Sequence, residues 1–299
     1  MKPKIIIIQG PTASGKSAIA IKLAKEFNGF LISADSRMIY KGMDIGTNKD
    51  KGKWVANTYI VQGVEEKMID VVLPDQEFTV DDWVKQVKMI IKEDKRLPVI
   101  VGGTGFYTQA LVNNFKLPVG KNDELRDKLE KELKEKGIES LVKKIKEIDP
   151  DIESKIDIQN PRRVIRAAEI CLQTKKPLER QVGRPLYEAF QIGINFDREK
   201  LYEKINKRVD EMIEEGLVKE VEGLMKQGFS EKLQSMTGIG YRQVVQYLTG
   251  KLSSSDAVEL IKRDTRRYAK RQITWLKRDK TINWVNSAKE AQDLIRKFV

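Results

Sequence analysis

Residues 5–17, IIIIQGPTASGKS, combine residue types and a spacing that suit phosphate binding. Two glycines, a lysine and a serine match the pattern G-x-x-x-x-G-K-[ST] between an apolar stretch and a helical one. In such a loop, backbone N–H groups and the positive end of a helix face phosphate oxygens, and the lysine neutralises charge. A structural glycine turn is the alternative. The pattern predicts a phosphate site, with the serine hydroxyl as a Mg²⁺ ligand, made by Gly10, Pro11, Thr12, Ala13, Ser14, Gly15, Lys16 and Ser17.

Asp35 is the carboxylate expected nearest to this loop. It ends the apolar stretch FLISA, and the carboxyl ends of neighbouring parallel strands open onto one crevice. Enzymes that act on phosphates use such a carboxylate to hold metal or to activate an acceptor, whereas a helix or turn cap is the structural alternative. The chain has no histidine. Histidine triads and histidine-ligated metals are therefore excluded, and a general base must be a carboxylate or, less favourably, Lys or Tyr.

A third segment, LPVIVGGTGFY, ends in glycines rather than in an acid. A strand without an acid at its end does not hold metal as the strands of the usual nucleotide hydrolases do. Its glycines and Thr104 allow backbone and a hydroxyl to approach a ligand closely. A tight strand-to-helix turn is the alternative.

Short apolar stretches alternate with helical ones around these segments, which predicts an α/β fold with a P-loop-type parallel sheet core flanked by helices. Thr79 and Asp82 match a capping box at the start of one helix. The expected strands cover residues 5–9, 30–34, 98–101, 191–196 and 281–285, and the expected helices include residues 17–26, 79–95 and 254–277.

Residues 116–189 differ from the rest because they are highly charged, helical in pattern and without a convincing strand. We therefore expect an inserted all-helical subdomain and a catalytic core made by residues 1–115 and 190–299. Cys171, the single cysteine, falls within an apolar helical pattern and is expected to fill the core of the insertion.

The chain has a formal net charge of +12, from 56 basic and 44 acidic residues. A basic surplus favours a polyanionic partner, although solvated charged helices explain it equally well. In the helix expected at residues 254–277, Tyr268 and Trp275 fit a core-facing side. The other side carries a basic stripe made by Arg263, Arg267, Lys270 and Arg271. No apolar run approaches the roughly 20 residues of a membrane span, and the first apolar run is too short for a signal peptide, so we expect a cytoplasmic location without membrane contact. We also expect a monomer.

Five segments in one order resemble the tRNA dimethylallyltransferases, also called tRNA isopentenyltransferases: GPTASGKS, DSRMIYKGMDIGT, VGGTGFY, QNPRRVIRAAEI and RRYAKRQITWLKR. The resemblance spans nearly the whole chain. It implies transfer of a dimethylallyl group from dimethylallyl diphosphate to N6 of adenosine 37, beside the tRNA anticodon, with Mg²⁺ as cofactor. The glycine-rich loop would then hold the diphosphate leaving group.

The resemblance also implies roles for single residues. Asp35 would accept the proton of the N6 amine, Thr104 would position the diphosphate and the adenine, and Arg208 would lie near the diphosphate. For Arg208, an ion pair with Glu211 on the same helix is the structural alternative.

Contacts to the anticodon stem-loop are implied by the same resemblance. A solvated helix face explains Arg126 nearly as well, and Asn160 and Pro161 also fit the cap and the first position of a helix. The implied set comprises Asp35, Ser36, Arg37, Met38, Thr104, Arg126, Gln159, Asn160, Pro161, Arg162 and Arg163.

Two positions depart from the residues usual in that family. Met38 stands where glutamine is usual, which removes a hydrogen bond to a loop base but leaves a thioether that can pack against it. Glu66, Lys67 and Met68 stand where many members have His-His-Leu, so those histidines are not needed for the chemistry.

Three other functions stay open at this point. A P-loop kinase or NTPase would use the same loop, but the acid-free strand argues against it. A prenyltransferase acting on free adenine nucleotides needs neither the helical insertion nor the basic surplus. A non-catalytic RNA-binding protein would leave the loop and Asp35 without a role.

Overall fold

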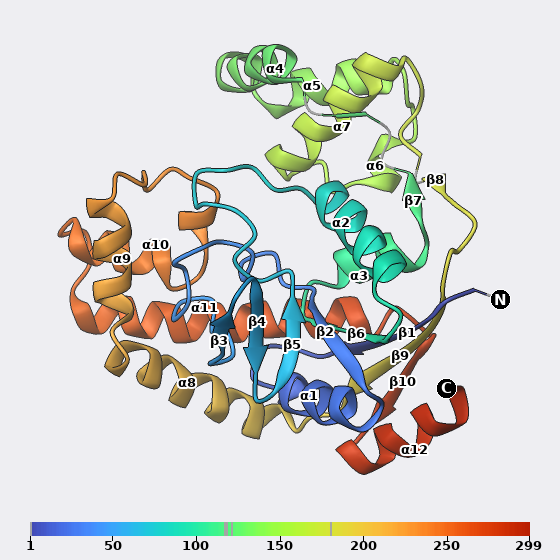
Figure 1. The fold of residues 1–299 in the computed structure, drawn as a ribbon. Coiled ribbons are helices and arrows are strands. Elements are labelled where there is room, and N and C mark those ends of the chain that lie inside the picture. The colour runs from blue at the N-terminus through green and yellow to red at the C-terminus, as the bar shows by residue number, and fades with distance from the viewer. Residues whose placement is uncertain (1, 117–118, 121, 180) are drawn as a thin grey trace. The chain divides into compact units, whose positions relative to one another are not determined.

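The computed structural model describes residues 2–116, 119–120, 122–179 and 181–299 (Figure 1). The chain divides into two compact units: Met1–Val112 with Pro185–Val299, and Asn113–Arg184. The sequence placed the second boundary at residue 189, which lies inside strand β9 (Glu188–Ile194). Because β9 pairs with β1 (Lys4–Gln9) from its first residue, Glu188, the chain has to re-enter the first unit before that strand begins.

One eight-stranded sheet forms the centre of the first unit, in the order β10-β9-β1-β6-β2-β5-β4-β3. Neighbouring strands from β10 to β5 are parallel, and an antiparallel β4-β3 hairpin extends the edge. The central strands are apolar on both faces because helices cover both. This confirms the expected α/β class with a P-loop-type core. The other strands are β2 (Gly29–Ser33), β3 (Lys53–Val55), β4 (Thr58–Val61), β5 (Val64–Lys67), β6 (Leu97–Gly102) and β10 (Ile282–Val285).

Helices pack on both faces of this sheet (Figure 1). Helices α1 and α12 share one apolar cluster with the sheet, while Trp83 of α2 donates its indole N–H to the Ser33 carbonyl over 2.9 Å. The predicted capping box is present, since the Thr79 hydroxyl accepts the Asp82 N–H over 3.2 Å and the Asp82 carboxylate accepts the Thr79 N–H over 2.9 Å. The α-helices of this unit are α1 (Lys16–Glu26), α2 (Val80–Glu93), α3 (Gly105–Val112), α8 (Arg198–Glu214), α9 (Leu217–Lys226), α10 (Tyr241–Leu248), α11 (Ser254–Leu276) and α12 (Ala288–Phe298), with a 3-10 turn at Ser235–Thr237.

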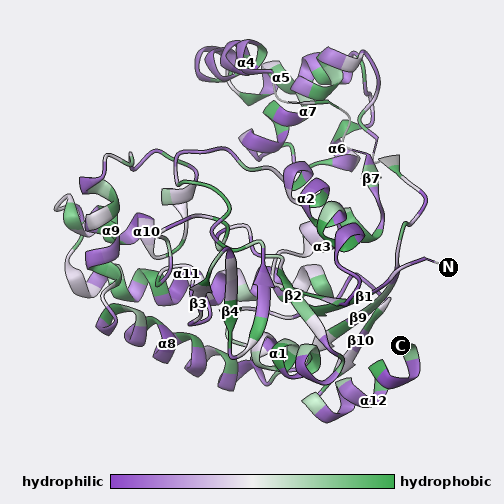
Figure 2. Ribbon diagram, viewed as in Figure 1, coloured by the Kyte–Doolittle hydropathy of each residue, from purple (hydrophilic) through white to green (hydrophobic). Residues whose placement is uncertain are grey.

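Figure 2 shows hydrophilic and hydrophobic residues alternating along α8. Its buried residues recur every three or four positions, at Leu201, Ile205, Val209 and Met212, as expected of a helix with one face against a core. In the described part of the chain, no helix combines the length and the apolar sequence that a membrane crossing requires.

The second unit has its own apolar core, in which Cys171 is fully buried, as expected. Asn160 caps α7 by accepting the Arg163 N–H, and Pro161 occupies the first turn. The unit is not wholly helical, because the two segments that lead in and out pair as two-residue strands. Its elements are α4 (Asp123–Lys136), α5 (Ile138–Lys146), α6 (Ile152–Lys155), α7 (Pro161–Thr174), β7 (Phe115–Lys116) and β8 (Gln181–Val182).

Candidate active site

A pocket of about 620 Å³ opens in the first unit where β1, β2 and β6 end. Its wall includes the loop between β1 and α1, the turn after β2, residues 46–48 and 50, and side chains of α8 and α11. The turn after β2 carries Asp35, and the loop after β1 carries Lys16 and Ser17. The sheet therefore brings the predicted base and the predicted phosphate loop to one cavity, as the strand order implies.

The loop between β1 and α1 has the shape of an anion cradle. Gly15 adopts a left-handed conformation with φ of 84° as the N-cap of α1, which suits glycine because it has no Cβ. The first N–H groups of a helix have no intrahelical acceptor, so those of Lys16 and Ser17 can face a phosphate. The Thr12 and Ser14 N–H groups instead donate within the protein, to Gln272 Oε1 over 2.9 Å and to the Pro11 carbonyl over 3.2 Å.

Two cations face this cradle. Arg208 donates from Nη1 to Thr12 Oγ1 over 2.8 Å, and Lys16 Nζ lies 3.4 Å from the Pro11 carbonyl. Burial, and then the charge of Arg208, lowers the pKa of Lys16 to about 8, while burial lowers the pKa of Arg208 to about 10. Two half-buried cations that disfavour each other's charge form a site for an anion.

The position of Arg208 does not fit its alternative role, an ion pair with Glu211. The Glu211 carboxylate lies 3.5 Å from Nζ of Lys207, one turn away on α8. The Arg208 side chain extends instead to the phosphate loop, where the family resemblance places it.

Asp35 has one oxygen engaged and lines the pocket. Its Oδ1 accepts the Arg37 N–H over 2.8 Å, so it caps a turn and also faces the cavity. Thr104 lies beside it, because the Thr104 hydroxyl accepts the Ser36 N–H over 3.4 Å. Asp35 and Thr104 thus meet at one edge of the site, as predicted from two separate segments.

Tyr268 of α11 also lies at that edge of the site, although the sequence pattern predicted that it faces the core. It lines the pocket that Asp35 also lines. Burial, followed by the nearby Asp35 charge, raises the pKa of Tyr268 to about 12, so the phenol stays protonated at neutral pH. The Arg271 guanidinium lies 5.8 Å from the centre of the Tyr268 ring. Trp275, by contrast, packs against α3 at Gly105, in agreement with its core assignment.

Gln272 is a site residue that the sequence did not reveal. Its side chain accepts from Thr12 N–H over 2.9 Å and donates to the Gly103 carbonyl over 3.0 Å. A Cβ on Gly103 would collide with this amide, which explains the second glycine of the GGTG segment. The Gln272 amide joins two loops that are far apart in the sequence, and no local sequence pattern indicates this role.

The oxygen donors near α1 suit a hard divalent cation. Ser17, in the first turn of α1, shares the pocket with the Asp50 and Glu66 side chains. Glu66 is only 5% exposed, and its Oε2 has no hydrogen-bond partner. Burial, and then the charge of Asp50, raises the pKa of Glu66 to about 8. Hydroxyl and carboxylate oxygens fit Mg²⁺, which takes one or two carboxylates together with phosphates and water. Among the described residues, no three acidic or sulfur side chains gather into a complete metal cage.

Residues 38–279 match the family model of the IPP transferases. The chain belongs to this family. A tRNA dimethylallyltransferase of Acetivibrio thermocellus is 47% identical over an alignment of 292 residues, which covers 94% of this chain and 91% of the relative. A tRNA dimethylallyltransferase of Clostridioides difficile is 44% identical over an alignment of 290 residues, which covers 95% of this chain and 91% of the relative.

Two solved structures share the fold of this IPP transferase. The full-length tRNA isopentenylpyrophosphate transferase of Bacillus halodurans has a TM-score of 0.71 and 36% identity, covering 99% of this chain and 95% of the other. A eukaryotic dimethylallyltransferase, described as acting on tRNA, has a TM-score of 0.75 and 27% identity, covering 92% and 70%.

The implied tRNA contacts of the transferase fall in both units. In the first unit, Asp35, Ser36, Arg37 and Met38 line the pocket. Arg37 donates to the Gln234 carbonyl over 2.5 Å. The Met38 sulfur lies 3.7 Å from the Ser33 hydroxyl, and its side chain packs against the apolar cluster under α1.

In the second unit, the implied contacts occupy α4 and the start of α7. Arg162 and Arg163 are exposed in the first turn of α7, where the Arg163 guanidinium lies 3.9 Å from Asp157. Gln159 precedes the Asn160 cap. Arg126 lies 3.9 Å from the fully buried Glu169 carboxylate, so it also holds α4 and α7 together.

Proposed function

We propose that this chain transfers a dimethylallyl group from dimethylallyl diphosphate to N6 of adenosine 37 in tRNA. The observation that carries this proposal is one pocket that is lined by two cations, Lys16 and Arg208, and by the Asp35 carboxylate. The cations match a diphosphate, and the carboxylate matches an acceptor that must lose a proton.

The phosphate loop and its cations act on the leaving group. When the allylic C–O bond breaks, its electron pair goes to the diphosphate, and negative charge grows on the oxygen that leaves. Lys16, Arg208 and the N–H groups at the start of α1 stabilise that charge most when it is fully developed, which lowers the barrier. Mg²⁺, bound at Ser17, would supply further charge neutralisation there.

Asp35 acts on the nucleophile. The N6 nitrogen forms the new C–N bond with its electron pair and then carries a positive charge, which it loses with one of its protons. The free oxygen of Asp35 accepts that proton, while Oδ1 stays fixed by the Arg37 N–H. Thr104 and the protonated Tyr268 orient the adenine beside this carboxylate.

The acceptor has to leave its base stack to reach the pocket. Sequence-specific RNA readers act on loops because bases there can be splayed out. We place the anticodon stem-loop against Asp35, Ser36, Arg37, Met38 and Thr104 in the first unit and Arg126, Gln159, Asn160, Pro161, Arg162 and Arg163 in the second. The basic surplus of the chain suits this partner. We expect a monomer in the cytoplasm, where tRNA is available.

One assay tests the proposal against its closest rivals. The chain is incubated with dimethylallyl diphosphate, Mg²⁺ and either unmodified tRNA or AMP, and nucleosides are analysed for N6-dimethylallyl adenosine. We expect product on tRNA at position 37 alone. Product on AMP with unmodified tRNA left intact would overturn the assignment of the acceptor. Phosphate release from ATP without prenylation would overturn the reaction itself.

A further inference from the structure

A second pair of carboxylates, Asp50 and Glu66, lines the pocket apart from Asp35. Glu66 lies on β5 and Asp50 lies in the loop before β3. Tyr59 links the two, because it pairs with Glu66 across the strands and its hydroxyl donates to the Asp50 carbonyl. Neither residue has a role in the reaction derived above, although both share the cavity with Ser17.

Glu66 is fixed by the sheet, and one oxygen of its carboxyl group lacks a partner. It pairs with Leu31 on β2 and with Tyr59 on β4, so it stands between two strands. It is 5% exposed, and its Oε2 makes no hydrogen bond. A buried carboxylate without a partner is costly, and such groups are normally paired with a cation or bound to a metal.

Hydrogen bonds to the backbone hold Asp50 in place, so its side chain is available to line the pocket. The Tyr59 hydroxyl donates to the Asp50 carbonyl over 2.8 Å and accepts the Gly52 N–H over 3.0 Å. The preceding residue, Lys49, is 9% exposed and donates to the Tyr40 carbonyl over 2.7 Å.

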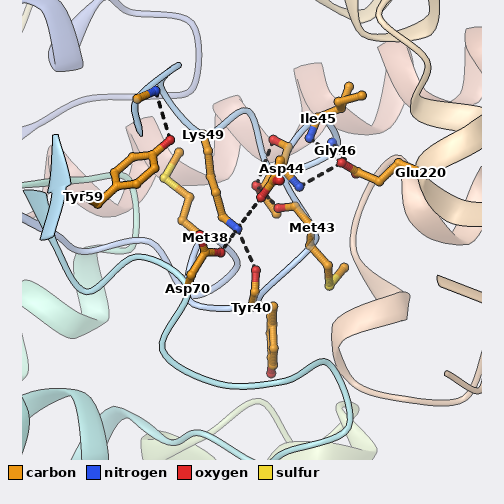
Figure 3. A network of polar contacts seen from close by, with 12 residues as sticks. Met38, Tyr40, Met43, Asp44, Ile45, Gly46, Lys49, Tyr59, Asp70 and Glu220 are labelled. Carbon is orange, nitrogen blue, oxygen red and sulfur yellow. Dashed lines mark hydrogen bonds and ion pairs between the residues drawn. The ribbon is translucent and has the colours of Figure 1, made fainter. Parts of the chain in front are cut away.

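Figure 3 shows the Lys49 ammonium between the Asp44 and Asp70 carboxylates, with which it forms ion pairs. The charge of Lys49 is therefore already compensated by these two carboxylates. When a diphosphate occupies the loop, it also compensates the charges of Lys16 and Arg208. A bound diphosphate would then leave the Asp50 charge uncompensated and Glu66 Oε2 without a hydrogen-bond partner at the edge of an anion site.

We propose that Asp50 and Glu66 form the carboxylate side of a divalent-cation site, completed by Ser17 and by the diphosphate of the bound donor. This inference rests on the proposed function, because it takes the diphosphate as the ligand of the loop. It accounts for the buried oxygen of Glu66, and it matches the preference of Mg²⁺ for one or two carboxylates, phosphate oxygens and water. It also leaves Asp35 free to take a proton.

The test measures cation binding rather than turnover. Mn²⁺ replaces Mg²⁺ because its free form has a strong paramagnetic resonance signal, and inorganic diphosphate stands in for the donor. We expect the Mn²⁺ affinity of the diphosphate-bound protein to fall at least tenfold in Asp50→Asn and in Glu66→Gln, in line with the roughly 10- to 100-fold effects of removing groups that support a metal.

Glu65→Gln is the matched control, because Glu65 is the next residue on β5 and forms an ion pair with Lys67 on the same strand. Its Mn²⁺ affinity should equal that of the wild type. Unchanged affinity in both Asp50→Asn and Glu66→Gln would overturn the proposal, and so would a tenfold loss in Asp35→Asn. If Glu66→Gln does not fold, as judged by circular dichroism, Asp50→Asn decides, since Asp50 lies in a loop.

The prenylation assay on the wild type separates this inference from the function on which it rests. A wild type that prenylates tRNA, with variants that bind Mn²⁺ normally, contradicts only the cation site. A wild type that does not prenylate tRNA contradicts the function, whatever the cation measurements give.

Discussion

Arg208 donates a hydrogen bond from Nη1 to Thr12 Oγ1 over 2.8 Å, and this contact holds helix α8 against the phosphate loop. The guanidinium thereby faces the loop that we propose as the diphosphate site. Arg208→Met should lower kcat/KM for dimethylallyl diphosphate by about 100- to 1,000-fold, the usual cost of removing one donor to a developing anion. Lys207→Met, which removes the exposed neighbour paired with Glu211, should change kcat/KM less than about twofold. Equal losses in both variants would contradict the role of Arg208.

Asp35→Asn should separate binding from chemistry. Asparagine keeps an oxygen for the Arg37 N–H, so the turn should persist, but the amide cannot accept a proton. We expect single-turnover prenylation to slow by about 100- to 10,000-fold, while the Kd for inorganic diphosphate stays within about twofold. Loss of diphosphate affinity would instead identify Asp35 as a metal ligand.

Gln272→Leu should loosen the contact between the phosphate loop and the turn after β6. The substitution keeps the volume but removes the partners of Thr12 N–H and the Gly103 carbonyl. We expect a loss of about 1–3 kcal/mol in the free energy of unfolding, measured with urea, together with a raised KM for the donor. Gln246→Leu on the exposed face of α10 should cost less than about 0.5 kcal/mol and leave KM unchanged.

The affinity for dimethylallyl diphosphate without metal should fall as the pH rises through about 8. The pKa of Lys16 is about 8 because burial and Arg208 disfavour its charge, so the protonated, anion-binding form is lost above that pH. Phosphate groups with a second pKa near 6 are already fully ionised there and cannot produce the trend. Titration calorimetry between pH 7 and 9.5 measures it, and Lys16→Arg should abolish it, because arginine stays charged.

Arg162→Ala and Arg163→Ala should weaken tRNA binding through lost phosphate contacts. Both side chains are exposed at the start of α7, where an RNA backbone can reach them. Each lost contact should reduce the slope of log K against log salt concentration by about 1 or slightly less. Lys131→Ala, which removes an exposed partner of Glu135 on α4, should leave that slope unchanged. The same slope in the double arginine variant would exclude these residues from the interface.

Local patterns predicted the parts of the site that depend on adjacent residues. The phosphate loop, the Thr79 capping box and the Asn160 cap each need a particular conformation over a few positions, and residue type reports that conformation directly. Asp35 was found because parallel strands end at one edge. The β4-β3 hairpin was missed, since its strands, such as KWV and TYIV, are short and lie at a sheet edge.

Residues that act across long separations in sequence were not predictable in this way. Gln272 bonds to residues about 170 and 260 positions away, and Tyr268 meets Thr104 through the packing of α11. Their roles follow from tertiary contacts, and an amphipathic pattern on one helix cannot distinguish a pocket-facing side chain from a core-facing one. Glu66 was visible only as a departure from the family, and its burial became evident in the sheet.

The loop that carries Asp50 has a consequence for the cost of binding. Lys49 fixes it from within, and the Glu220 carboxylate accepts the N–H groups of Asp44, Ile45 and Gly46 over 2.7–3.1 Å (Figure 3). Its conformational entropy is therefore lost when the chain folds rather than when substrate arrives. Because this loop is already ordered, the free energy of the contacts with the donor and the RNA does not have to offset the ordering of a flexible segment. That free energy can therefore contribute to affinity and rate.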